Sequence, residues 1–378
     1  MGRRVYAGLT MTKALGELGL IGRIRSGWGG AGAAERGGGG RARGAGIVLG
    51  IGDDCAILRP PRGHEVLVTT DFTLEGRHFR RDWHPPESVG HRTLARGLSD
   101  LAAMGACPLG AFLSLALPGE MLATRAGRRW VERFFAGLRG LGERCGVPLA
   151  GGDTAESPCG LVLADIMLVG SAPAGRALRR SGGRAGDALY VTGELGGAAA
   201  ELAAMERRAT KGQPMFSGEA GDDGLPGLGA AAHPQMYPQP RVGVGLALLR
   251  RRLATAAIDL SDGLSTDLAH LCRESGVGAE VSATELPIHP LALKASGGPE
   301  CAPGLAPGLA LGLALDGGED YELLFAAPAG VRMPRRVTGV RVTRIGSLVR
   351  GKGISLLDHG GRRRRLQPGG WEHFSKKH

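Results

Sequence analysis

Carboxylates stand at the edges of apolar runs at four separated places in this chain, and this pattern constrains the fold more than any other feature. They are Asp53 with Asp54, Asp71, Asp100 and Asp153, in the segments GIGDDCAIL, VLVTTDFTLEGRHF, LSDLAAMGACP and LAGGDTAESP. Hard divalent cations such as Mg²⁺ take oxygen ligands and are usually shared between carboxylates and substrate phosphates. Since one carboxylate binds Mg²⁺ weakly, carboxylates from several strand ends must come together to form a metal site. The pattern predicts a polynuclear metal site for phosphoryl transfer.

Strand-like and helix-like segments alternate along the chain, which predicts an α/β (α+β) architecture. Helical spacing of apolar residues predicts helices at 13–25, 88–104, 130–145, 198–207, 241–251 and 264–275. Short apolar or β-branched runs predict strands at 65–70, 147–150, 161–169, 187–192 and 321–326. With 378 residues and 43% hydrophobic content, the chain can bury the cores of two domains.

Glycine-rich stretches divide the chain. Residues 1–46 are predicted to hold an N-terminal helix and a flexible Gly/Arg-rich insertion, because the low-complexity segment from Gly27 to Gly46 has little apolar surface to bury. A first domain is expected over residues 47–172 and a second α/β domain over residues 173–378. Residues 211–233 and 295–308 are expected to be surface loops.

The net charge of +11 is unevenly distributed. Residues 1–46 carry +6 and residues 332–378 carry +11, which leaves −6 for the body between them. Basic ends on an acidic body are typical of solvated tails with some attraction for polyanions. Nucleic-acid binding is not expected, because aromatic residues, which form base-stacking platforms, make up only 4% of the chain.

The location and redox chemistry follow from features that the chain does not have. No apolar run reaches membrane-spanning length and the N-terminus lacks the order of a signal peptide, so we expect a cytoplasmic protein with no membrane partner. The six cysteines have no CxxC spacing, which argues against a zinc site or a disulfide framework.

A set of motifs in a fixed order resembles the thiamine-monophosphate kinase family, a member of the superfamily of aminoimidazole ribonucleotide synthetase-like ATP-dependent enzymes. The motifs, found between Lys13 and Phe374, are GELGLI, GIGDDCAIL, TTDFTLEGRHF, SDLAAMGACP, LSLALP, AGGDT, GDALYVTGELGGAAA, AIDLSDGLSTDLAHLC, LDGGEDYELLF and GWEHF. The resemblance implies phosphorylation of thiamine monophosphate by ATP, giving thiamine diphosphate. It also implies that residues 47–172 form the metal- and ATP-binding domain, and that the protein is a homodimer. In this dimer the sheets of that domain from the two subunits join into a barrel.

The resemblance assigns metal ligands in both domains. Those predicted to bind several Mg²⁺ ions are Asp54, Thr70, Asp71, Asp100, Asp153, Asp259 and Asp262, with Asp53 adjacent to them. Any one of these aspartates could instead cap a helix or close a turn. For Asp53 the two interpretations are about equal.

The resemblance also assigns substrate contacts. Gly152, Arg180, Ser261 and Phe135 are predicted to contact ATP, and Phe135 stands where some relatives have a tyrosine. A guanidinium suits bidentate phosphate binding. His78, Glu319 and Trp371 are predicted to contact thiamine monophosphate, with the indole face meeting the cationic thiazolium. The acceptor phosphate is already ionised near neutral pH, so no residue is assigned as a general base.

One motif resembles a phosphate-binding loop but is not expected to act as one. The segment from Gly346 to Gly353, GSLVRGKG, has the G-x-x-x-x-G-K spacing but lacks the following Ser or Thr, and it leads into a strand-like GISLL. We interpret it as a loop between strands.

Two other functions remain open. Another ATP-dependent synthetase of the same superfamily would use similar carboxylates, although GRHF, GGEDYELLF and GWEHF favour the thiamine enzyme. A polyanion-binding protein without catalytic activity would use the basic termini, including the run from Arg362 to Arg365. Release of ADP that depends on thiamine monophosphate separates the kinase from both alternatives.

Overall fold

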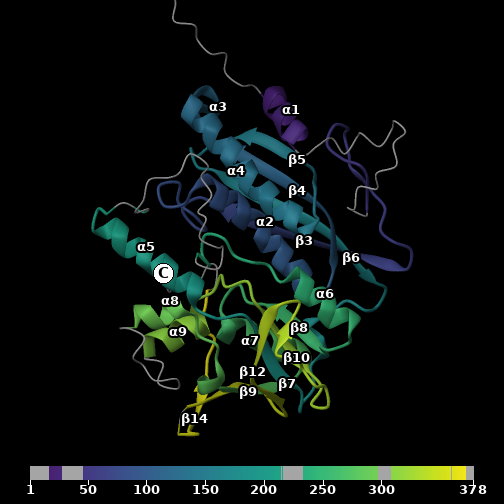
Figure 1. Ribbon diagram of the computed structural model, residues 1–378, viewed down its shortest axis with the longest axis vertical. Coiled ribbons are helices and arrows are strands. Elements are labelled where there is room, and N and C mark those ends of the chain that lie inside the picture. The colour runs from purple at the N-terminus through teal and green to yellow at the C-terminus, as the bar shows by residue number, and fades with distance from the viewer. Residues whose placement is uncertain are drawn as a thin grey trace, which may run out of the picture.

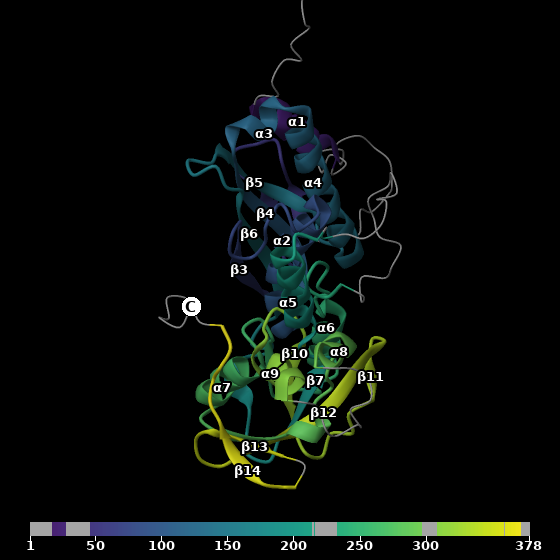
Figure 2. The same ribbon diagram turned by 90° about the vertical axis from the view of Figure 1, so that its left-hand side faces the viewer.

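The computed structural model describes residues 17–27, 46–213, 215, 233–296, 308–358 and 360–371. Most of the glycine-rich insertion and of the two predicted loops lies outside these ranges. Figures 1 and 2 show two parts stacked along the long axis, with α1 to α4 and β3 to β6 at one end and the second sheet at the other. None of the described helices has the length and apolar character needed to span a membrane.

The first domain is built on a four-stranded sheet in the order β3-β6-β4-β5. Its strands are β3 (His64–Leu74), β4 (Cys107–Leu117), β5 (Leu149–Glu156) and β6 (Leu163–Pro173), and only the β4 and β5 pair is parallel. Its helices are α1 (Glu17–Gly27), α2 (Pro86–Ala103), α3 (Gly119–Ala123) and α4 (Arg125–Cys145). A short hairpin of β1 (Ile47–Leu49) and β2 (Ile57–Leu58) precedes the sheet.

Helix α2 lies on one face of this sheet and α4 packs against α2 (Figure 1). The start of α2 is favoured by Pro86, whose fixed backbone angle suits the first turn. The two helices approach closely because glycines face the neighbouring backbone: a Cβ at Gly90 would lie 1.9 Å from the Phe134 oxygen. On the other face of the sheet, β3 exposes Val66, Val68 and Phe72.

The second domain holds an eight-stranded sheet with the path β14-β13-β9-β12-β7-β10-β8, and β11 pairs with β12. The strands are β7 (Ala188–Thr192), β8 (Ala256–Asp259), β9 (Gly278–Ser282), β10 (Leu323–Ala327), β11 (Arg336–Val337), β12 (Val340–Val349), β13 (Ile354–Leu357) and β14 (Arg363–Leu366). The helices are α5 (Gly197–Thr210), α6 (Val242–Arg250), α7 (Leu264–Ser275), α8 (Pro290–Ala295) and α9 (Gly308–Asp316). Both sheets are open in the described chain, so the barrel across a dimer stays a prediction.

The expected elements are present with shifted ends. Helix 264–275 has the expected bounds, whereas the strand predicted at 65–70 runs from His64 to Leu74 because β6 pairs with it along its whole length. The GSLVRGKG segment is only partly a loop. Strand β12 continues to Val349, and a turn at residues 350–353 leads into β13.

Helix α2 joins the two domains. It contacts α6 and β8 of the second domain as well as β3, β4 and β6 of the first. A Cβ at Gly245 of α6 would lie 1.9 Å from the Ala102 oxygen of α2, so glycine is required for this close crossing. One hydrophobic core cluster accordingly runs from the first domain into α6 and includes Phe325 of β10. The carboxyl end of α2 is therefore held against the second sheet.

Candidate active site

Three charged side chains form a row along α2. Arg92, Arg96 and Asp100 are spaced four residues apart, which places them on one face of the helix. Asp100 accepts a hydrogen bond from the Thr69 hydroxyl of β3. Arg96 Nη2 lies 3.3 Å from Asp71 Oδ1 of the same strand. The row thus faces the predicted metal-binding strand, and its two arginines were not predicted from the sequence.

Asp71, Asp100 and Asp259 come close enough to affect one another's ionisation. Burial raises the pKa of Asp71 to about 6, the charge of Arg96 opposes the shift, and the charge of Asp100 adds to it. Burial also raises the pKa of Asp100. In Asp259, at the end of β8, burial and then the charge of Asp100 raise the pKa. The tertiary structure therefore brings three of the predicted carboxylates together from α2, β3 and β8.

Hydroxyl and cationic groups surround these carboxylates. Ser99 Oγ donates to Asp259 Oδ2 at 2.8 Å, within the buried interface of the two domains. Arg180 lies in a short 3₁₀ turn, Arg180–Gly182, and its charge favours the ionised forms of Asp100 and Asp259. Arg180 is thus near two predicted metal ligands, as a phosphate contact would have to be.

The chemistry of this donor set fits a hard divalent cation. The carboxylates repel one another in a buried setting, and a cation among them would remove the repulsion. In the described residues, however, no three His, Cys, Asp or Glu side chains are arranged as a coordination sphere. Asp71 is paired with Arg96, Asp100 with Thr69 and Asp259 with Ser99 instead.

The loop before α7 holds the predicted residues Ser261 and Asp262. Asp267 Oδ2, one turn into the helix, accepts the backbone N–H groups of both at 3.1 Å. Burial, followed by the charges of Asp259 and Asp262, raises the pKa of Asp267 to about 8. Asp267 therefore fixes this loop, and an Asp in the first helical turn is the sequence signal that could have identified it.

The C-terminal segment runs across the same helix end, and Figure 2 shows it passing alongside α7 after β14. Gly370 N donates to Thr266 Oγ1 at 3.1 Å, and Trp371 N donates to the Asp262 oxygen at 3.0 Å. The Trp371 residue remains 37% exposed. The predicted substrate aromatic and a predicted metal ligand are thus joined by a backbone hydrogen bond.

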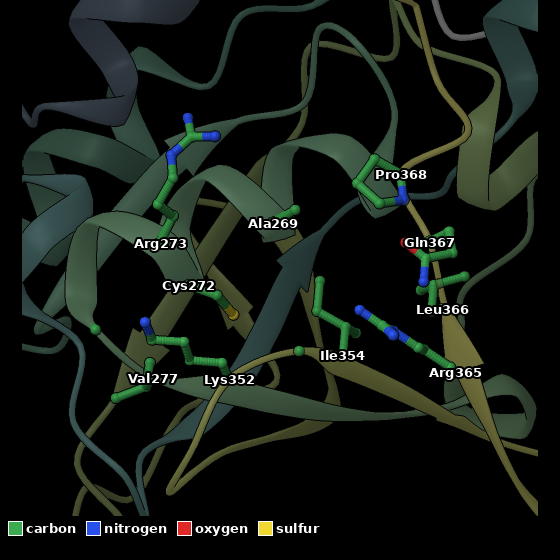
Figure 3. A pocket seen from close by; sticks show the side chains of 12 residues that line it. Ala269, Cys272, Arg273, Val277, Lys352, Ile354, Arg365, Leu366, Gln367 and Pro368 are labelled. Atoms are coloured by element: carbon green, nitrogen blue, oxygen red, sulfur yellow. The ribbon is translucent and has the colours of Figure 1, made fainter.

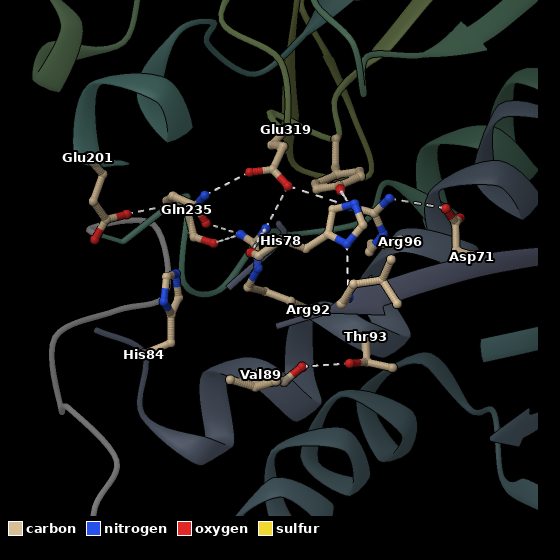
Figure 4. A network of polar contacts seen from close by, with 12 residues as sticks. Asp71, His78, His84, Val89, Arg92, Thr93, Arg96, Glu201, Gln235 and Glu319 are labelled. Carbon is tan, nitrogen blue, oxygen red and sulfur yellow. Dashed lines mark hydrogen bonds and ion pairs between the residues drawn. The ribbon is translucent and has the colours of Figure 1, made fainter. Parts of the chain in front are cut away.

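Glu319 lies in a network of polar contacts (Figure 4). Its Oε1 is 2.7 Å from Nη2 of the fully buried Arg92, and its Oε2 accepts from Gln235 Nε2 at 2.7 Å. Arg92 Nη2 also donates to the His78 oxygen at 3.2 Å, so the predicted substrate residues His78 and Glu319 share one arginine. Leu74 N donates to His78 Nδ1 at 2.9 Å.

The backbone around Glu319 is strained. Glu319 and Tyr321 have φ values of 57° and 50°, in the region that favours glycine. Such conformations cost on the order of 1 to 3 kcal/mol each and persist where surrounding contacts impose them. Here the contacts are the ion pair of Glu319 with Arg92 and a 2.7 Å hydrogen bond from Arg96 Nη1 to the Tyr321 hydroxyl.

Other predicted residues lie apart from this cluster. Asp53, Asp54 and Asp153 are exposed, and Asp53 and Asp153 each accept the N–H of the following residue, at 2.9 Å. Thr70 is exposed on β3, where alternation places it on the face opposite Asp71. These contacts are those of turn and strand residues, so their role as metal ligands stays a prediction.

Gly152 and Phe135 are placed by backbone and core contacts. Gly152 has φ of 148°, and a Cβ there would lie 2.0 Å from the Leu113 oxygen, so the position requires glycine for strand packing. Phe135 is buried in α4, with its ring edge-on to Phe134 at 5.4 Å. It lines a cavity of about 100 Å³ between α1 and α4 with Leu20 and Ile24. Its contact with ATP stays a prediction.

Comparison with known proteins agrees with this architecture. Residues 52–172 match the family described as AIR synthase related protein, N-terminal domain, and residues 184–307 match its C-terminal domain. The two domains and the carboxylate cluster between them define a protein of the AIR synthase-related class, a mixed α/β two-domain fold.

Closer relatives narrow the class. A thiamine-monophosphate kinase of Salmonella typhimurium is 38% identical over 282 residues, which cover 75% of this chain and 77% of that protein. The chain belongs to the thiamine-monophosphate kinase family. The crystal structure of the thiamine-monophosphate kinase from Stenotrophomonas maltophilia superimposes with a TM-score of 0.70 at 34% identity, covering 90% of this chain and 96% of that one. AaThiL complexed with AMPPCP and TMP gives 0.65 at 28% identity, covering 97% and 100%.

Proposed function

We propose that this protein transfers the γ-phosphoryl group of ATP to the phosphate of thiamine monophosphate, giving thiamine diphosphate and ADP. Membership of the kinase family supports the reaction, and a relative that covers nearly the whole chain binds AMPPCP and TMP together. ATP is thus the co-substrate. Neither the synthetase nor the polyanion-binding alternative is favoured by these relatives.

The observation that carries the proposal is the convergence of Asp71, Asp100 and Asp259 at the domain interface. Burial is the main cause of their raised pKa values, and the charge of Asp100 adds to the shifts of Asp71 and Asp259, so a cation among the three carboxylates would stabilise their ionised forms. We propose that they hold Mg²⁺ with the remaining predicted ligands Thr70, Asp153, Asp262, Asp54 and Asp53. When bound, Mg²⁺ would neutralise charge on the phosphates of ATP.

The chain's own cations and backbone complete the site in this proposal. Arg180 contacts the transferred phosphate, since its charge lies near Asp100 and Asp259. Gly152, Ser261 and Phe135 contact ATP. The acceptor phosphate is ionised near pH 7, so the enzyme needs to position it in line with the γ-phosphate and needs no general base.

For the thiamine moiety we propose His78, Glu319 and Trp371. Arg92 positions two of them, because it bonds the His78 oxygen and the Glu319 carboxylate at once. Trp371 can place its π-face against the thiazolium cation, since its backbone is tied to Asp262 while the residue remains partly exposed.

We further propose that the enzyme is a homodimer acting in the cytoplasm. Val66, Val68 and Phe72 are 50%, 59% and 60% exposed along the open face of β3. A row of large apolar side chains on an uncovered sheet face favours burial against another copy of that face. This arrangement would form the barrel across the dimer that the family resemblance implies.

An assay of ADP release with two acceptors tests the reaction. We expect turnover with thiamine monophosphate and Mg²⁺, and none with an aminoimidazole ribonucleotide precursor. Asp100→Asn should lower kcat at least about a hundredfold, because it removes a negative charge proposed to hold the Mg²⁺ that would stabilise the transferring phosphoryl group. Glu143→Gln, the same chemical change on the exposed surface of α4, should leave kcat unchanged. Turnover with the aminoimidazole ribonucleotide precursor but not with thiamine monophosphate would identify a synthetase. The absence of turnover with either acceptor would exclude the kinase.

A further inference from the structure

A cavity of about 310 Å³ opens between α7, the turn from β12 to β13, and β14 (Figure 3). Its centre is apolar and is formed by Ala269, Cys272, Val277 and Ile354. The volume is at the lower end of the range for small-molecule sites, which is roughly 300 to 1,000 Å³. It is large enough for a ligand with a single ring.

Cationic side chains line this apolar centre. Figure 3 shows Lys352 on one side, near Cys272 and Val277, and Arg365 on the other, near Ile354. Arg273 also lines the cavity, but its guanidinium points away from it in this view. Among the described residues that form the lining, none is acidic. The cavity therefore favours an anion.

The two cations that flank the apolar centre have no ion pair within the described part of the chain. The neighbouring Arg363 of the same strand, by contrast, is paired with Glu280 of β9, and Arg273 lies 3.8 Å from Glu274. The Gln367 amide stands next to Arg365 in the lining and adds two N–H donors. Arg365 and Gln367 together match the acceptor oxygens of a phosphate.

The turn that carries Lys352 is held in a defined conformation. Gly351 and Gly353 have φ values of 94° and 96°, which other residues adopt only with strain. Ala279 N of β9 donates to the Gly353 oxygen at 3.1 Å. Lys352 is thus presented from a fixed turn. This turn belongs to the GSLVRGKG segment, to which the proposed kinase reaction assigns no role.

We propose that this cavity binds a monocyclic organic phosphate. The ring lies on Cys272 and Ile354, the phosphate is held by Arg365 and Gln367, and Lys352 donates at the other end. The cavity is separate from the active site. None of the predicted active-site residues lines it, and Ala269, its lining residue nearest the amino end of α7, lies five positions after Leu264, about 8 Å along the helix axis. Asp262 precedes that amino end. The proposal goes beyond the kinase reaction and does not depend on it.

Calorimetric titration of the full chain with phenyl phosphate tests the site, in the presence of saturating AMPPCP and Mg²⁺ so that the nucleotide site is filled. We expect binding, with phenol and inorganic phosphate each at least about tenfold weaker, because each lacks one half of the recognised chemistry. Arg365→Ala and Lys352→Ala should each weaken phenyl phosphate binding about tenfold, the effect of losing one charge-assisted contact.

Arg364→Ala is the matched control. It removes the same charge from the neighbouring position of β14, which alternation turns to the other face, and Arg364 does not line the cavity. It should bind phenyl phosphate like the unaltered protein. The proposal fails if the unaltered protein does not bind phenyl phosphate. It also fails if Arg365→Ala and Lys352→Ala bind it as tightly as Arg364→Ala does.

Discussion

Acidification from pH 7 to pH 5 should destabilise this fold through His91, a buried histidine of α2. Its Nε2 lies 2.7 Å from the Pro238 oxygen, so this nitrogen carries the proton. Its Nδ1 accepts from Arg144 Nη2 at 3.5 Å, and the Tyr237 ring packs edge-on at 5.4 Å. A second proton would have to sit on Nδ1, directly against the guanidinium.

The magnitude follows from the difference in pKa between the folded and unfolded states. The pKa of His91 falls from 6.5 to about 4, mainly because of burial; the bond to Pro238 opposes this shift, and the charges of Arg144 and Arg92 contribute to it. The unfolded chain therefore takes up a proton as the pH falls through 6.5, whereas the folded chain does not until about pH 4. Stability is lost in that window, by about 2 kcal/mol between pH 7 and pH 5.

Urea unfolding of the unaltered protein and of His91→Gln at both pH values isolates this effect. Glutamine cannot titrate, but its amide can donate to Pro238 and accept from Arg144. Buried groups such as His84 and Asp320 titrate equally in both proteins and cancel. The loss of stability on acidification should be about 2 kcal/mol smaller in His91→Gln. An equal loss in the two proteins would refute the assignment of this linkage to His91.

Two further predictions concern helix packing and substrate specificity. Gly137→Ala places a Cβ 1.9 Å from the Glu87 oxygen, and we expect about 1 to 3 kcal/mol of destabilisation by thermal unfolding, whereas Gly140→Ala, with its nearest contact at 3.9 Å, should be neutral or slightly stabilising. Trp371→Ala should raise the KM for thiamine monophosphate far more than that for ATP, by about 1 to 2 kcal/mol of lost cation–π energy. Equal shifts in both KM values would remove Trp371 from the substrate site.

The family and the order of elements could be predicted from the sequence because their signals are local. A motif such as AIDLSDGLSTDLAHLC contains a strand end, a loop and a helix start in one continuous segment, and the helix 264–275 has the predicted bounds. The extent of β3 was underestimated, since its last residues are held by pairing with β6, a partner about ninety residues away in the chain. The residues of one short segment say little about pairing with a strand so distant in the sequence, so the end of β3 could not be predicted from them.

For the candidate site too, some features could be predicted from the sequence and others depend on the tertiary structure. The sequence, through its motifs and the family resemblance that they carry, predicted Asp71, Asp100 and Asp259 as metal ligands. Only the tertiary structure decided that these three share an environment, because their proximity depends on α2 packing against both sheets. It also decided that Arg92 bonds His78 and Glu319, contacts that span 14 and 227 positions along the chain. The type of side chain at each position can be read from the sequence. Its burial and its electrostatic interaction with other charged groups arise only when distant segments pack together and exclude water from one another.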